Sequence, residues 1–67
     1  MIKQKLGRNI AELRKSRKLT QEELAEKADY SVEFISFVER GINSPSVAGC
    51  ERIAKVLHVP IKKLFDF

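Results

Sequence analysis

The sequence predicts an all-α fold, a compact domain of five helices, and three observations support this prediction. Apolar residues recur at helical intervals along most of the chain: Ile2, Leu6, Ile10 and Leu13, for example, are spaced by four, four and three residues. Residues that typically begin or end helices separate these segments. No segment shows the strict alternation of apolar and polar residues that indicates a β-strand.

Length and composition predict a single domain that spans residues 1–67. The chain has 67 residues, of which 43% are apolar, so it can form one small core but not two domains. No apolar run approaches the roughly 20 residues of a membrane span, and the charged N-terminus does not resemble a secretory signal. Cys50 has no partner for a disulfide, and with His58 it supplies too few ligands for a metal. We expect a cytoplasmic protein without metal, cofactor or small-molecule ligand.

The first two helices are predicted from their spacing and start signals. The first runs from about residue 3 to residue 16 or 17. The second begins after Thr20, because Thr20 and Glu23 have the spacing of a capping box, in which each side chain accepts a hydrogen bond from the other's backbone N–H. It ends near Asp29 after about nine residues, and three of its residues are expected to face the core: Leu24, Ala25 and Ala28.

A third helix is predicted over residues 32–40. Ser31 is its expected N-cap, and Gly41 ends it, because glycine readily adopts a positive φ. The helix turns Ile35 and Val38 inward, with Phe34 at the core edge. Two helices of about nine residues that are joined by a tight turn form the outline of a helix-turn-helix, here over about residues 20–40.

Two further helices are predicted after a loop. Pro45 and Ser46 lead into the fourth helix, which Gly49 weakens by up to about 1 kcal/mol relative to alanine. Pro60 starts a short fifth helix, because proline is favoured in the first turn. The residues expected to line the buried side of the fourth helix are Val47, Cys50, Ile53, Ala54 and Leu57. Cys50 is therefore interpreted as a core residue rather than a redox sensor.

Charge is distributed unevenly along the chain. Residues 1–18 contain seven basic residues and one acidic residue, whereas residues 19–39 contain one basic and six acidic residues. From Arg40 onward, five basic residues stand against two acidic ones, and the whole chain carries a net charge of +4. Basic ends around an acidic middle suit a polyanion that touches part of the surface, such as nucleic acid. Well-solvated charged faces explain the same pattern, so charge alone leaves both interpretations open.

Several of these segments together resemble the phage repressor/Cro-type helix-turn-helix DNA-binding family. The resemblance covers nearly the whole chain, with spacing preserved, and rests on residues 13–14, 19–25, 35–41, 45–46, 53–60 and 64–65. Within the family, the short chain and residues 38–41 are similar to restriction–modification controller proteins. The resemblance implies a transcriptional regulator that binds double-stranded DNA at a pseudo-palindromic operator as a homodimer, with helix 32–40 in the major groove.

The resemblance also implies which residues contact DNA. The family's base-reading positions correspond to Ser31, Val32, Glu33, Ser36 and Phe37. The family uses the position of Gln21 to contact the DNA backbone, at the start of a helix where N–H groups favour an anion, and we expect the Thr20 hydroxyl to add a contact there. Arg40, Asn43 and Ser44 follow the third helix and are expected to flank a phosphate. Relatives usually carry Gln, Arg, Thr or Asn at the base-reading positions. Here valine and phenylalanine can contact a thymine methyl, and glutamate can accept from the cytosine amino group, with DNA shape contributing further specificity.

Two further expectations follow from the resemblance and concern structure. Arg14 and Glu39 occupy positions where relatives form an ion pair between the first and third helices, so we assign them a structural role. Asp29 replaces the glycine that most relatives carry in the turn, and aspartate tolerates the left-handed conformation required there. Tyr30 is expected to pack over this turn.

The C-terminal segment is unusually apolar, and two roles are open to it. A chain this short leaves apolar surface that a second copy can cover, and the family forms its dimer contact in this region. The predicted dimer interface comprises Val59, Ile61, Leu64, Phe65 and Phe67. Alternatively, these residues only complete the core.

The same residues bear on two other classes of function. The third helix, with Val32, Phe34 and Phe37, also suits a protein-interaction module, such as an antitoxin or anti-regulator that docks through this helix. The sequence shows no nucleophile paired with a base, no paired catalytic carboxylates and no phosphate-binding glycine loop. We therefore expect no enzymatic activity.

Overall fold

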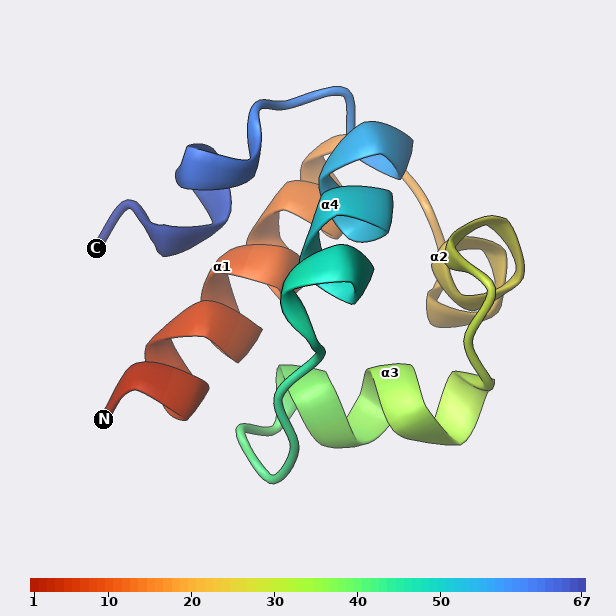
Figure 1. The fold of residues 1–67 in the computed structure, drawn as a ribbon. Helices are drawn as coiled ribbons and strands as arrows, with labels where there is room; N and C mark the ends of the chain where they lie inside the picture. The colour runs from red at the N-terminus through yellow and green to blue at the C-terminus, as the bar shows by residue number, and fades with distance from the viewer.

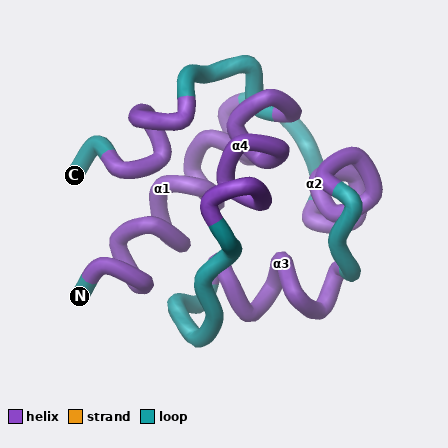
Figure 2. Tube along the Cα trace, viewed as in Figure 1, coloured by secondary structure: helices purple, strands orange, loops and turns teal.

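The computed structural model describes residues 1–67 and consists of helices joined by short loops, with no strand (Figures 1 and 2). The prediction of an all-α fold is confirmed. There are four α-helices and one 3-10 helix: α1 (Ile2–Ser16), α2 (Gln21–Ala28), α3 (Val32–Glu39), α4 (Val47–Val56) and η1 (Ile61–Phe65). Residues 20–40 contain α2, a tight turn and α3, as the sequence predicts.

The short fifth helix that the sequence predicts is a 3-10 helix and not a fifth α-helix. The backbone N–H of Lys63 donates to the carbonyl of Pro60 at 2.9 Å, three residues back, so η1 is a 3-10 helix. Between Pro60 and Asp66 there are only five residues, which leaves room for few α-helical hydrogen bonds, in which an N–H donates to the carbonyl four residues back. Such short segments commonly adopt the 3-10 form.

Side-chain caps fix the starts of α2, α3 and α4. Thr20 and Glu23 form the predicted capping box: the Glu23 N–H donates to Thr20 Oγ1 at 3.0 Å, and the Thr20 N–H donates to Glu23 Oε1 at 2.8 Å. The hydroxyls of Ser31 and Ser46 each accept from the N–H three residues further on. Hydrogen bonding from Thr20 to the charged carboxylate lowers the pKa of Glu23.

Glu23→Gln is expected to lower the melting temperature at neutral pH and much less in acid. Because the folded-state pKa of Glu23 is below its unfolded value, its contribution is present above the unfolded pKa and is lost as pH falls through the folded pKa. Thermal denaturation at neutral pH and at about pH 3 measures this difference. Glu22→Gln is the matched control, because Glu22 lies in the same first turn but makes no capping hydrogen bond. Equal losses in both variants would contradict the capping role.

The core lies where the five helices meet, and it contains the inward residues predicted for α2 and α3. Its fully buried large side chains are Leu6, Ile10, Leu24, Ile35, Val38, Ile53, Leu57 and Leu64. Phe34 is partly buried at the core edge, as expected. The prediction that Val47 is buried is wrong: its side chain is 77% exposed, because it lies in the first turn of α4 and the buried face begins one turn later, at Cys50 and Ile53.

Gly7 allows α1 to lie directly against the end of α3. A β-carbon at this position would overlap the carbonyl oxygen of Val38 and lie 3.0 Å from that of Glu39. Because both obstacles are backbone atoms, no side-chain rearrangement can accommodate them. Gly7 therefore sets the position of α3 relative to α1, a role that the sequence analysis did not predict.

The turn between α2 and α3 is held from both sides. Asp29 adopts the left-handed conformation, with φ of 63°, as expected from its place in the turn. Arg52 of α4 donates from Nε to the carbonyl of Ala28 at 2.9 Å, which caps α2, and its guanidinium lies 4.8 Å from the centre of the Tyr30 ring. Tyr30 also covers Gly49, where a β-carbon would overlap its hydroxyl. Glycine at position 49 is thus required by packing, despite its cost to the helix.

Candidate nucleic-acid interface

The helix α3 lies at one edge of the molecule, and no other element covers its outer face (Figure 1). Ile35 and Val38 are fully buried and anchor its inner face. The start of α2 contacts the C-terminal end of α3, because Gln21 Nε2 donates to Glu39 Oε1, and the loop that follows α3 leaves from the same end. The element that the sequence assigns to DNA recognition is thus accessible along its length.

The five predicted base-reading residues differ in how much of each side chain is available. Ser31 and Glu33 are exposed, although the Ser31 hydroxyl already accepts from the Phe34 N–H at 3.1 Å. Val32 is partly buried against the core, and Ser36 is half-buried. Phe37 is 37% exposed. Glu33 and Phe37 therefore present the largest accessible side chains of this set.

Phe37 does not stand alone on the surface. The guanidinium carbon of Arg40, at the C-cap of α3, lies 5.0 Å from the centre of the Phe37 ring. This distance is within the range of a cation–π contact. Arg40 therefore restricts the orientation of the one exposed aromatic ring on α3.

The predicted phosphate-contacting residues lie at the start of α2 and in the segment that follows α3. Thr20 and Gln21 lie at the start of α2, where backbone N–H groups and the helix dipole favour an anion. Arg40, Asn43 and Ser44 are exposed and follow α3 along the chain. The side chain of Gln21 is not free: its Nε2 donates to Glu39 Oε1 at 2.9 Å, which leaves one amide hydrogen for a further acceptor.

The ion pair between Arg14 and Glu39 is present and links α1 to the end of α3. Arg14 Nε donates to Glu39 Oε2 at 2.7 Å, and Nη2 donates to Oε1 at 3.1 Å, in the bidentate geometry that is strongest for this pair. The two side chains are only 11% and 6% exposed. A third guanidinium nitrogen, Nη1, donates to the Leu19 carbonyl at 2.7 Å. The pair therefore ties together α1, the loop before α2 and α3.

One of the five predicted dimer-interface residues is misassigned. Leu64 is completely buried among core residues of its own chain, because η1 turns this side chain inward against α1 and α4. Val59 and Ile61 are half-buried against the same core. Phe65 and Phe67 are 43% and 53% exposed, with ring centres 6.5 Å apart, so these two rings are the part of the set that a second chain can cover.

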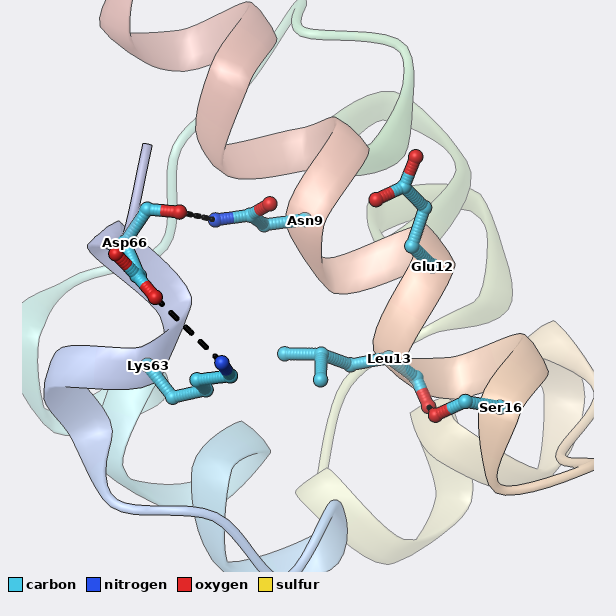
Figure 3. A pocket seen from close by; sticks show the side chains of 6 residues that line it. All are labelled: Asn9, Glu12, Leu13, Ser16, Lys63 and Asp66. Carbon is cyan, nitrogen blue, oxygen red and sulfur yellow. Dashed lines mark hydrogen bonds and ion pairs between the residues drawn. The ribbon is translucent and has the colours of Figure 1, made fainter.

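Asn9 holds the C-terminal segment against α1, a contact that the sequence analysis missed. Its Nδ2 donates to the carbonyls of Leu64 at 3.0 Å and Asp66 at 3.2 Å, and Figure 3 shows the side chain directed toward Asp66. The same region contains an open hollow of about 300 Å³ whose lining is mostly polar: Asn9, Glu12, Leu13, Ser16, Lys63 and Asp66. This hollow is between α1 and η1 and does not involve α3.

Other chemistry-bearing residues do not gather into a site. The structure contains no group of three or more His, Cys, Asp or Glu side chains placed to hold a metal. Cys50 is buried, and burial raises the pKa of its thiol. No helix has both the length and the apolar character needed to cross a membrane.

Comparison with known proteins identifies the same fold and family. The immunity repressor protein of Bacillus phage phi105 is 37% identical over 59 residues, which are 88% of this chain but only 41% of the repressor. Control protein C.BamHI of Bacillus amyloliquefaciens is 37% identical over 62 residues, 91% of this chain and 76% of that protein. A crystal structure of SinR, the master regulator for biofilm formation, in complex with DNA superposes with a TM-score of 0.85 at 34% identity, covering 91% of this chain and 98% of that one.

These relatives are regulators, and the family itself is defined by the motif described above. The helix-turn-helix family model matches residues 10–64, which include all of α2, α3 and α4. With this match and these relatives, the chain belongs to the helix-turn-helix family of transcriptional regulators.

Proposed function

We propose that this chain binds a specific double-stranded DNA operator as a homodimer, with α3 in the major groove. The observation that carries the proposal is the uncovered outer face of α3, with exposed polar residues near its C-terminal end that suit phosphate. An α-helix fits the major groove, where base edges present a distinct pattern for each pair. Residues 1–67 would act as one DNA-binding domain in the cytoplasm.

The phosphate contacts in this proposal come from the start of α2 and from the segment after α3. Gln21 would use its second amide hydrogen at the start of α2, with Thr20 beside it. Arg40, Asn43 and Ser44 would contact further phosphates of the backbone. Such contacts orient the helix without reading sequence, so base readout falls to the exposed residues of α3.

A two-fold dimer would give the operator its symmetry. Two copies of α3 set about 34 Å apart, one turn of B-DNA, would read two half-sites in inverted orientation. Phe65 and Phe67 are the proposed contact, because their rings are exposed and adjacent. Relatives that are named repressors and control proteins support a regulatory role for such binding.

Salt-dependent, sequence-preferring binding is the expected behaviour in solution. Fluorescence anisotropy on the protein's own upstream promoter duplex and on a scrambled duplex, each at two salt concentrations, measures it. We expect preference for the promoter and an affinity that falls with salt, by a logarithmic slope of about 0.9 for each phosphate neutralised. Weak, equal binding to both duplexes that does not vary with salt would contradict DNA recognition.

A protein-interaction module remains the second candidate, because Phe37 exposes apolar surface on the same helix. In that case α3 would dock against a protein partner as an antitoxin or anti-regulator does. An apolar interface releases no condensed counterions, so its affinity should vary little with salt. The salt series above therefore separates the two candidates.

The double substitution Phe65→Ser with Phe67→Ser is expected to give folded monomers with weaker operator binding. Both rings are exposed, so their removal should leave the core intact, whereas substitution of Leu64 would disrupt the core. Analytical ultracentrifugation measures the mass, and circular dichroism checks the fold. Val47→Ser is the matched control, since Val47 is an exposed apolar residue in the first turn of α4, outside the proposed interface and the proposed DNA contacts. A double variant that stays dimeric would contradict this interface.

Asn9→Asp tests the same interface without touching an aromatic ring. A carboxylate cannot donate to the carbonyls of Leu64 and Asp66, so residues 65–67 should be held less firmly against α1 while Leu64 stays in the core. We expect a dimer dissociation constant at least several-fold higher than that of the wild type. A dimer of unchanged affinity would show that the contact with Asn9 does not position the interface.

A further inference from the structure

We infer that α3 reads a cytosine and a thymine in each half-site, the cytosine through Glu33 and the thymine through Phe37. Arg40 serves as a positioning residue for the Phe37 ring. This inference rests on the proposed function, because it requires α3 to lie in the major groove.

Accessibility selects these two residues from the exposed face of α3. The side chains of Ile35 and Val38 are fully buried, Val32 is packed against the core, and Ser36 is half-buried. The Ser31 hydroxyl is occupied by the helix cap. Glu33 is exposed and makes no ion pair or side-chain hydrogen bond, so its carboxylate is free to accept one.

The chemistry of a carboxylate selects cytosine. An ionised carboxylate only accepts hydrogen bonds, and the major groove offers two donors, the amino groups of cytosine and adenine. Adenine places the N7 acceptor beside its amino group, so a carboxylate there meets a second negative centre. The thymine O4 of the same pair lies on the other side of the adenine amino group, so that group has an acceptor on each side. The cytosine amino group has one neighbouring acceptor, the O6 of the paired guanine, and a C5–H on its other side, which makes cytosine the favourable base for Glu33.

The chemistry of the Phe37 ring selects thymine. The ring has no donor or acceptor, and the thymine methyl is the apolar group that the major groove presents. The Arg40 guanidinium, 5.0 Å from the ring centre, restricts the ring and supplies positive charge beside it. Held in this way, the ring offers its remaining surface to a methyl while the guanidinium remains near the DNA backbone.

The spacing along α3 relates the two bases. Glu33 and Phe37 are four residues apart, so they share a face of the helix and are separated by about 6 Å along its axis. The base-pair rise is about 3.4 Å. The cytosine and the thymine should therefore lie one or two base-pair steps apart in the half-site.

The experiment begins with operators selected from a random duplex library by the full chain. In the selected operator, thymine is replaced by uracil, which removes the methyl but keeps every hydrogen-bonding group. We expect binding about fourfold weaker when uracil replaces the thymine that lies one or two base-pair steps from the selected cytosine, and no change when uracil is placed outside the half-sites. In Phe37→Ala, the uracil and thymine operators should bind with equal affinity. Phe37→Leu, which keeps an apolar group, guards against a folding defect.

Arg40→Ala tests the positioning role. Whatever its general loss of affinity, the affinity for the thymine operator divided by the affinity for the uracil operator should fall.

A second arm tests the cytosine. Glu33→Gln is expected to enrich adenine at the position where the wild type enriches cytosine, because glutamine pairs with adenine N6 and N7. Two results would overturn this inference and leave the proposed function standing. In the first, the selected operator binds equally well with uracil and with thymine. In the second, Glu33→Gln still enriches cytosine at the same position. Failure to enrich any sequence contradicts the proposed function itself, and the base assignments with it.

Discussion

Glu39→Ala is expected to lower the free energy of unfolding by about 3–5 kcal/mol, because it leaves a buried guanidinium without its counterion. Glu39 accepts two hydrogen bonds from Arg14 and one from Gln21. Its removal thus leaves a charge and an amide unpaired at the junction of α1, α2 and α3. Urea denaturation of the variant and the wild type measures the loss.

Two controls show whether the loss of stability comes from leaving a buried charge unpaired or from removing any ion pair. Asp66→Ala breaks the exposed pair with Lys63, whose atoms are 3.5 Å apart, and should change stability little, as exposed pairs usually do. The double variant Arg14→Met with Glu39→Leu removes both charges and should recover much of the loss. A Glu39→Ala variant as stable as Asp66→Ala would show that the pair does not hold α3 in place.

Gly7→Ala is expected to destabilise the fold by about 1–3 kcal/mol, although alanine is the better helix former. The added β-carbon meets the backbone carbonyls of Val38 and Glu39, so α3 must move away from α1. Operator binding should weaken as well, since the same shift moves the recognition helix. Thermal denaturation and anisotropy measure the two effects.

Arg8→Ala is the matched control for Gly7→Ala, because Arg8 is the next residue of α1 and is exposed. It should leave stability nearly unchanged. Helix propensity alone predicts that Gly7→Ala stabilises the protein by up to about 1 kcal/mol. A stabilised Gly7→Ala variant would therefore contradict the close approach of α1 and α3.

Local signals in the sequence predicted much of the fold. The capping box of Thr20 and Glu23 and the cap at Ser31 depend on neighbouring residues, and the start of each helix was predicted to within one residue of its observed position. Gly41 has the positive φ of 78° expected at the end of α3. The pairing of Arg14 with Glu39 came from the family resemblance, because nothing local to either residue predicts a contact across 25 positions.

Features that depend on tertiary distance could not be predicted in this way. In the sequence, Gly7 is an ordinary helical glycine, and only its contact with α3 shows why glycine is needed there. Asn9 resembles a surface residue, and only the position of the C-terminal segment against α1 shows its role. Leu64 was assigned to a dimer because apolar content does not distinguish a core contact from an interface contact. The five-residue length of η1 decides its geometry, whereas the apolar pattern is equally compatible with an α-helix.

The most direct test of major-groove recognition by α3 is selection of operators from a random duplex library by the full chain. We expect enrichment of an inverted repeat whose half-sites are centred about 10–10.5 base pairs apart, one turn of B-DNA. The variant Phe37→Ala should shift the enriched half-site, because this residue lies on the exposed face of α3. Absence of any enriched sequence, or a half-site unchanged by substitution on this face, would contradict recognition through α3.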